Sequence, residues 1–272
     1  MTKSIRSYLI AALALLISTV AAAETDEKID ASDPTKIYSY AGGGLKTTEY
    51  SNGDSLNEIR AIGNIGFSDS DMVMFELGYG RYSGSILPGE NKEGLTNGRA
   101  RYFHLFNMNY SITKGYRGWA TQIDLQFEGD VKGTNGGNTV ALGVLPAFGG
   151  GASWSFFLPL NYVSTWGSDF NNHQGHGISI APLAVYAPAE GPWPGFYLQI
   201  WPSYTRYFSG DLDGKGGAAV DLTTGWSITP TTILNATFQQ NFDENLKLYK
   251  PSNGSSSGAN DWNLFANINF YF

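Results

Sequence analysis

The stretch "WATQIDLQFEG", Trp119–Gly129, alternates between apolar and polar side chains along its length. One set of alternate positions is mainly apolar: Trp119, Thr121, Ile123, Leu125 and Phe127. The other set is mainly polar: Ala120, Gln122, Asp124, Gln126 and Glu128. Because successive side chains of a β-strand point to opposite faces, the pattern predicts a strand with one apolar and one polar face. A soluble β-sandwich and a transmembrane β-barrel both contain such strands.

The same alternation recurs from Lys36 onward, interrupted by clusters of Gly, Asn, Asp, Ser and Pro. It predicts about twelve strands, and any number from about ten to fourteen agrees with the pattern. The expected ranges are 37–50, 56–67, 72–83, 101–112, 118–129, 138–148, 153–165, 177–187, 196–208, 218–228, 232–243 and 261–272. Strands of about ten residues suit a tilted crossing of a bilayer.

Two further features favour a barrel that spans a membrane. Aromatic residues stand at both ends of several apolar faces, as Trp119 and Phe127 do, and two lipid–water interfaces select this arrangement. The connections "SDSD", "TKGYR", "GGGA" and "TPTT" are short, whereas 84–100, 166–176 and 244–260 are long. Short turns on one side and long loops on the other are typical of outer-membrane barrels. We therefore predict an all-β fold, a transmembrane antiparallel up-and-down β-barrel with both chain ends on the periplasmic side.

The composition limits the other possibilities. Residues 1–23 have a basic start, the apolar run "LIAALALLISTV" and a small-residue end, which predict a cleaved signal peptide. Residues 24–35 read as an acidic N-terminal lead, and 36–272 as the barrel. The chain has no cysteine, which excludes disulfides and thiolate metal sites. Its formal net charge of −7 argues against nucleic acid as a partner.

The last segment, "NDWNLFANINFYF" (Asn260–Phe272), alternates and ends on aromatic residues. With the signal peptide and the alternating strands, it resembles Gram-negative outer-membrane β-barrel proteins. The resemblance implies a location in the cell outer membrane, among lipid and lipopolysaccharide. It also implies that Phe270 and Phe272 form a signal for the barrel-assembly machinery. A looser likeness lies in "GISIAPLAVYAPAEGPWPGFYLQIWPSYTRYF", which is similar to a segment of the MetA-pathway phenol degradation transporter family.

The polar faces of the strands are expected to line the lumen. The predicted lining residues are Glu58, Arg60, Asn64, Glu76, Asn107, Asn109, Gln122, Asp124, Gln126, Glu128, Gln199, Asp221, Asn235, Gln239 and Asn267. Amides dominate, with a modest acidic excess, and Arg60 is the only basic residue placed well inside the wall. Glu58 and Glu76 are expected to pair with Arg60, since an unpaired buried charge is costly. Such a wall suits neutral solutes and disfavours anions. Alternatively, in a narrow barrel these side chains pair across the lumen and plug it.

Four successive predicted strands contain a proline: Pro146, Pro159, Pro182 and Pro202. Each proline forfeits a ladder hydrogen bond, because every strand of a closed barrel has two neighbours. The four positions predict either a row of bulges that bends this wall or opens a lateral path, or independent irregularities.

Three functions agree with the sequence pattern. The pattern favours a passive outer-membrane channel for small neutral or weakly hydrophobic solutes, with no cofactor. A lipid-acting barrel enzyme needs a serine beside a histidine, but no serine stands in a recognisable motif near His104, His173 or His176, so no catalytic residue is predicted. His104 is expected near the outer end of the fourth strand. The His173/His176 pair and "DLDGKGG" lack further ligands, so no metal site is predicted. The third hypothesis is a closed barrel with a structural or adhesive function.

Overall fold

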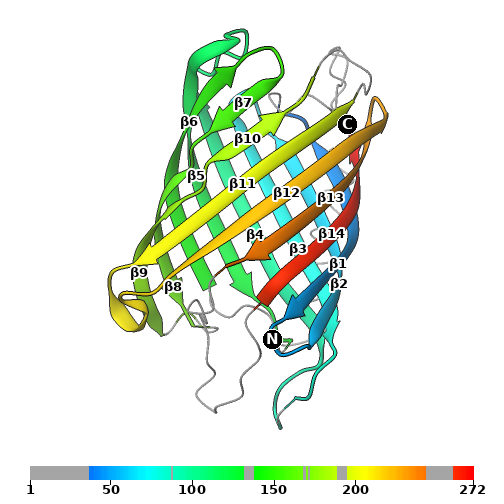
Figure 1. The fold of residues 1–272 in the computed structure, drawn as a ribbon, viewed down its shortest axis with the longest axis vertical. Helices are drawn as coiled ribbons and strands as arrows, with labels where there is room; N and C mark the ends of the chain where they lie inside the picture. Colours follow the sequence, from blue (N-terminus) through cyan, green and yellow to red (C-terminus); the bar gives the residue numbers. More distant parts are fainter. Residues whose placement is uncertain are drawn as a thin grey trace.

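The wall of the molecule is a closed antiparallel sheet, drawn in Figure 1. The computed structural model describes residues 37–86, 88–131, 138–167, 170, 172–188, 195–242 and 260–272. Its strands are β1 (Tyr40–Tyr50), β2 (Ser55–Gly66), β3 (Asp71–Tyr82), β4 (Glu93–Phe106), β5 (Lys114–Glu128), β6 (Asn138–Gly150), β7 (Trp154–Phe157), β8 (Leu160–Trp166), β9 (His173–Ile180), β10 (Leu183–Tyr186), β11 (Phe196–Tyr207), β12 (Gly216–Thr229), β13 (Thr232–Asn241) and β14 (Asn260–Tyr271). In the described part of the chain, no helix is long and apolar enough to cross a membrane.

Twelve strands cross the barrel, because two crossings are each made of two segments. Segments β7 and β8 both pair with β6, and β9 and β10 both pair with β11. The first and last strands close the sheet, with Tyr40 opposite Tyr271 and Leu45 opposite Ala266. The structure therefore confirms the predicted up-and-down barrel.

The barrel has two unlike ends. The connections 67–70, 107–113, 151–153 and 230–231 lie at one end, which we call the turn end, together with the strand ends at Tyr186 and Phe196. The connections 51–54 and 208–215 lie at the other, the loop end, together with the strand ends at Tyr82, Glu93, Glu128, Asn138, Trp166, His173, Asn241 and Asn260. The amide of Phe272 donates to the carbonyl of Ser39 (3.0 Å), so both ends of the described barrel meet at the turn end.

The fourth strand is the one whose predicted position is clearly wrong. The expected range was 101–112, but β4 runs from Glu93 to Phe106. The segment "EGLTNGRA" before Arg101 contains two glycines and few apolar residues, which hid its alternation. At the other end, Asn107 adopts a positive φ of 50°, which stops the strand.

Figure 1 shows strands β6 to β11 on the wall that contains the four prolines. Pro159 lies in the break between β7 and β8, and Pro182 in the break between β9 and β10. Backbone hydrogen bonds still bridge these breaks, from the Ala181 amide to the Pro159 carbonyl (3.0 Å) and from the Leu158 amide to the Pro146 carbonyl (3.0 Å). The Trp201 indole also donates to the Ala181 carbonyl (2.9 Å). The prolines thus interrupt the ladder while the wall stays bridged at that level.

The outer face of the barrel is apolar. Leu45, Ile59 and Leu234 point outward and are 68%, 67% and 51% exposed, as are many other large apolar side chains around the wall. A continuous apolar surface of this kind is unfavourable in water and stable in lipid. Aromatic contacts lie near its edges, for example Trp154 against Tyr186 at the turn end, with ring centroids 5.0 Å apart.

We expect Ile59→Arg to destabilise the barrel, because Ile59 lies mid-strand on the lipid-facing side. An arginine near the bilayer midplane costs about 2–4 kcal/mol. Urea unfolding in lipid vesicles, followed by the gel mobility of folded and unfolded protein, measures the change. The control is Asp211→Arg in the loop at 208–215, where the side chain is exposed. Equal stability of the two variants would contradict the membrane-facing assignment.

Candidate functional site

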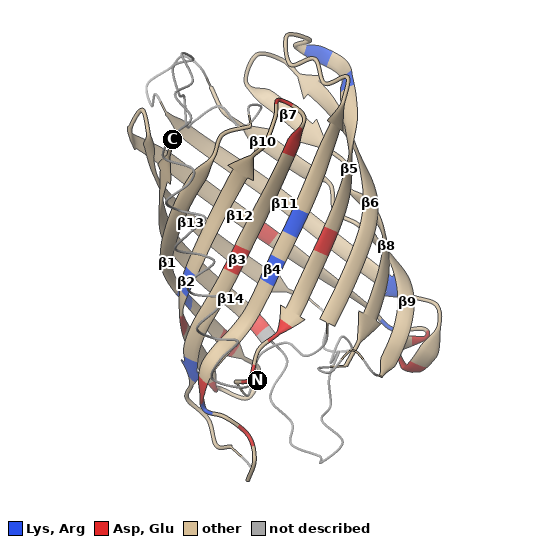
Figure 2. Ribbon diagram, turned by 180° about the vertical axis from the view of Figure 1, so that it is seen from behind, with Lys and Arg blue, Asp and Glu red and all other residues tan. Residues whose placement is uncertain are grey.

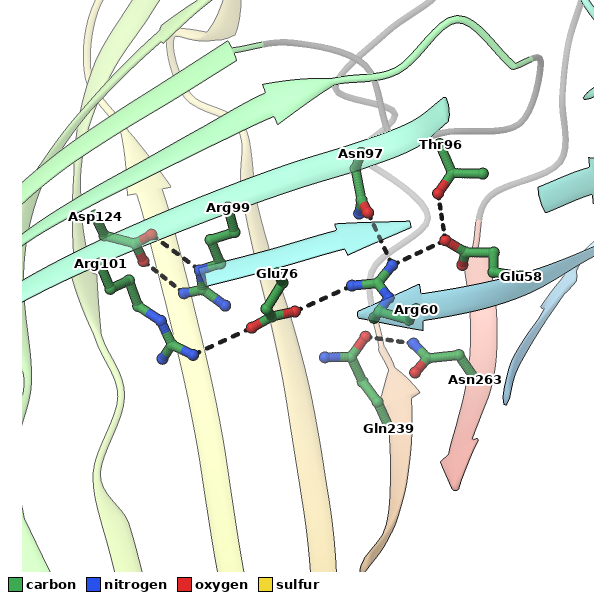
Figure 3. A network of polar contacts seen from close by, with 10 residues as sticks. All are labelled: Glu58, Arg60, Glu76, Thr96, Asn97, Arg99, Arg101, Asp124, Gln239 and Asn263. Carbon is green, nitrogen blue, oxygen red and sulfur yellow. Dashed lines mark hydrogen bonds and ion pairs between the residues drawn. The ribbon is translucent and has the colours of Figure 1, made fainter. Parts of the chain in front are cut away.

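Two neighbouring groups of ion pairs lie on the inner face of β2 to β5 (Figure 3), and together we call them the ion-pair network. Its centre is the Glu76 carboxylate on β3, which lies between two arginines. Arg60 Nη1 on β2 is 3.1 Å from Glu76 Oε2, and Arg101 Nη2 on β4 is 3.2 Å from Glu76 Oε1. Since β3 pairs with β2 on one side and β4 on the other, the sheet places this carboxylate between them.

The loop-end half of this network surrounds Arg60. Its Nη2 donates to Glu58 Oε1 and to Asn97 Oδ1, both at 2.9 Å. The hydroxyl of Thr96 donates to the same Glu58 oxygen at 2.5 Å. The Arg60 and Glu58 side chains are only 7% and 2% exposed, so each charge depends on its partners for compensation.

The other half joins β4 to β5. Arg99 Nε donates to Asp124 Oδ1 at 2.9 Å, and Arg99 Nη2 to Asp124 Oδ2 at 2.5 Å. This two-point geometry matches the guanidinium fork to the carboxylate and holds both in a fixed orientation. Figure 2 shows the resulting band of charged residues on β3, β4 and β5.

Gly78 on β3 makes room for this network. A Cβ at that position would lie 2.3 Å from Thr96 Oγ1 and 2.6 Å from Glu58 Oε1. Any larger residue would therefore displace the groups that hold Arg60, which explains why a glycine stands on the inner face here.

Across the lumen, strands β11 to β14 present amides and hydroxyls. Gln239 Nε2 donates to Asp221 Oδ1, and Asn263 Nδ2 donates to Gln239 Oε1, both at 2.6 Å. Closer to the turn end, Asn267 Nδ2 donates to Asn269 Oδ1 at 2.8 Å. These bonds orient the amides along the wall.

The structure places most of the predicted lining residues on inward-facing strand positions. These are Glu58, Arg60, Asn64, Glu76, Gln122, Asp124, Gln126, Glu128, Gln199, Asp221, Asn235, Gln239 and Asn267. The prediction that Asn107 and Asn109 line the lumen is wrong, because both are exposed and lie in the turn at 107–113 beyond β4. There Asn109 Oδ1 accepts bonds from the amide and hydroxyl of Ser111.

The expectation of a single inward arginine is also wrong. Arg99 and Arg101 lie on the inner face of β4, in the part of the strand that the sequence pattern missed. Lys46 faces inward on β1, since its neighbour Leu45 faces out and is 68% exposed. The segment "YAGGGLKTTEY" contains three successive glycines, so its sequence shows no clear alternation of polar and apolar side chains. With these cations counted, the middle of the lumen loses its acidic excess and becomes nearly balanced in charge.

The inner face becomes apolar toward the turn end. Phe103 and Leu105 on β4 and Ala120 on β5 are buried together there, packed with Met72 and Met74 of β3. The polar band at mid-height therefore borders an apolar one.

The histidines lie on the outer face. His104 is near the turn end, not the outer end, because β4 begins at Glu93. Its Nδ1 lies 2.7 Å from Asp71 Oδ1, whereas the Ser68 hydroxyl bonds the other oxygen of Asp71 (2.8 Å). No hydrogen bond joins a serine to His104 within the described ranges.

The other two histidines, His173 and His176, lie on β9. His173 Nε2 is 3.1 Å from Ser164 Oγ, and the rings of His173 and His176 are 4.2 Å apart. Ser164 is 6% exposed and lies under the wall surface, which leaves its hydroxyl shielded from a substrate. Among the residues that the structure describes, no cluster of three His, Cys, Asp or Glu side chains could hold a metal ion.

Comparison with solved structures shows that this is the fold of outer-membrane channels. An outer-membrane channel from Pseudomonas putida F1 matches with a TM-score of 0.57 at 12% identity, over 92% of this chain and 100% of that chain. The NanC porin matches with a TM-score of 0.55 at 8% identity, over 86% and 99% of the two chains. The KdgM porin, solved in complex with disordered oligogalacturonate, matches with a TM-score of 0.51 at 6% identity, over 85% and 99%. No protein-family model and no curated protein matches the sequence.

We expect Glu76→Gln to destabilise the barrel strongly. The change removes the carboxylate between Arg60 and Arg101 and leaves two buried cations without it, at a cost of about 3–5 kcal/mol. The same urea unfolding assay measures the effect. Glu93→Gln at the loop end is the control, since Glu93 is exposed and accepts only a long bond from Tyr79 (3.3 Å). A loss no larger than that of the control would refute the structural role of Glu76.

Proposed function

We propose that this protein is an outer-membrane channel through which small neutral solutes diffuse passively. The observation that supports this most is the inner wall at mid-height, where three arginines are paired with carboxylates within the wall and amides face them across the lumen. Because Arg60, Arg99 and Arg101 are paired with carboxylates, the wall does not bind a simple ion strongly. Its remaining hydrogen-bonding groups favour a solute that replaces water.

The apolar band at the turn end extends the proposal to weakly hydrophobic solutes. Phe103 and Leu105 are themselves largely buried, but the cluster that they form makes this part of the wall apolar. The fold shared with channels supports the same conclusion, and we propose no enzymatic activity, since the shielded Ser164 hydroxyl is poorly placed for attack.

The direct test is conductance of the purified protein in a planar bilayer, together with swelling of liposomes in arabinose. We expect discrete conductance steps and swelling that depends on the amount of inserted protein. Absence of both would refute the channel and favour a closed barrel whose loops bind partners.

We also propose that Phe270 and Phe272 act as the assembly signal, within a membrane of lipid and lipopolysaccharide. Both side chains face outward at the turn end, 52% and 40% exposed. Deleting Phe272 is expected to remove most of the folded protein from the outer membrane, while protein that does insert keeps its solute selectivity. Phe242→Ala, which removes an exposed aromatic ring at the loop end, is the control. Membrane fractionation of both variants decides the matter, and normal insertion after the deletion would disprove the proposal.

A further inference from the structure

Two charged side chains of the mid-lumen remain outside the ion-pair network. The ammonium group of Lys46 on β1 forms no side-chain hydrogen bond or ion pair with the described residues, although it interacts electrostatically with Arg60, Glu58, Glu76 and Asp221. Asp221 on β12 accepts one hydrogen bond, from Gln239 Nε2 at 2.6 Å, and is paired with no cation. Both side chains are partly exposed within the barrel, so both can be reached from the lumen.

These two charges lie on strands three places apart in the wall, close enough to interact electrostatically with each other. Asp221 interacts electrostatically with Arg99, Lys46 and Arg101, although β13 and β14 separate its strand from β1. In the sheet, Asp221 lies opposite Gln239 on β13, and Gln239 lies opposite Asn263 on β14. Asn263 in turn lies opposite Thr48 on β1. Thr48 is the next inward position after Lys46, so a row of amides connects the neighbourhoods of the two charges.

The rest of the network is balanced without them. Three arginines, Arg60, Arg99 and Arg101, are paired with three carboxylates, Glu58, Glu76 and Asp124. One positive and one negative charge are therefore left facing the solute path, at two separated points. A lone anion there is attracted by Lys46 but repelled by Asp221, and a lone cation experiences the reverse. A molecule that has both charges at a matching separation gains both attractions.

We propose that Lys46 and Asp221 form a binding site for small zwitterions, such as free amino acids. The solute carboxylate binds at Lys46 and its ammonium group at Asp221, while the amides of Gln239 and Asn263 lie between them. This inference depends on the proposed channel for its physiological meaning, and it deepens that proposal by naming a solute class. Zwitterions have no net charge, which agrees with a lumen whose charges are balanced.

The test is a binding measurement that does not require conductance. Folded protein in detergent is titrated calorimetrically with glycine, β-alanine, 4-aminobutyrate and 6-aminohexanoate, which separate the two charges by increasing distances. We expect one member to bind at least about tenfold more tightly than acetate or ethylamine, which have one charge each. Equal or absent binding of all these probes would overturn the site.

Variants then assign the site to its residues. We expect Lys46→Gln and Asp221→Asn each to weaken binding of the best probe at least about tenfold. The controls Lys114→Gln and Asp211→Asn remove exposed charges outside the lumen and are expected to bind as the parent does. Gel mobility confirms that each variant is folded. Unchanged affinity in both lumen variants would refute the assignment.

Failure of this inference is distinct from failure of the channel. Conductance and arabinose swelling without zwitterion binding would leave the channel intact and remove the site. Zwitterion binding without conductance would retain the site and remove passive diffusion.

Discussion

The pairing of β1 with β14 is the constraint on which the rest of the structure depends. Lipid offers no hydrogen-bonding partners, so every backbone group in a membrane-spanning sheet must be paired inside the protein. Closure between Tyr40 and Tyr271 at one end and Tyr50 and Asn260 at the other removes the sheet edges. Once the sheet is closed, alternate residues of each strand must face either lipid or an enclosed interior. The apolar exterior and the polar lumen follow from that single requirement.

The enclosed interior sets the second requirement, which is compensation of charge. The paired side chains of the wall are largely withdrawn from solvent, and a buried charge is stable only with a partner. Glu76 meets this need for two arginines at once, and Asp124 binds Arg99 through both of its oxygens. Glycine at position 78 provides the space in which these groups assemble. The network therefore stabilises the wall, and it also determines which charges remain accessible to a solute.

For the proposed channel, selectivity depends on which charges a solute can reach, and not on the total charge of the lumen. Arginines that are held by carboxylates offer little to a passing anion, whereas Lys46 and Asp221 retain unpaired charge. The apolar residues at the turn end, Phe103 and Leu105, make the path chemically uneven along its length. In the proposed channel, the polar region and the apolar region follow one another along the barrel axis.

The sequence alone determined the fold class, the approximate number of strands and most strand positions, because alternation is a local property that membrane burial imposes on every strand. The inward placement of Glu58, Arg60 and Glu76 followed from the same periodicity. Only the tertiary structure decided where β4 begins, since the polar, glycine-containing segment before Arg101 shows its face only when its neighbours are known. For that reason Arg99, Arg101 and Lys46 were missed, and Asn107 and Asn109 were misplaced. Which charges are paired across strands depends on register, and register is set by contacts between residues far apart in the chain.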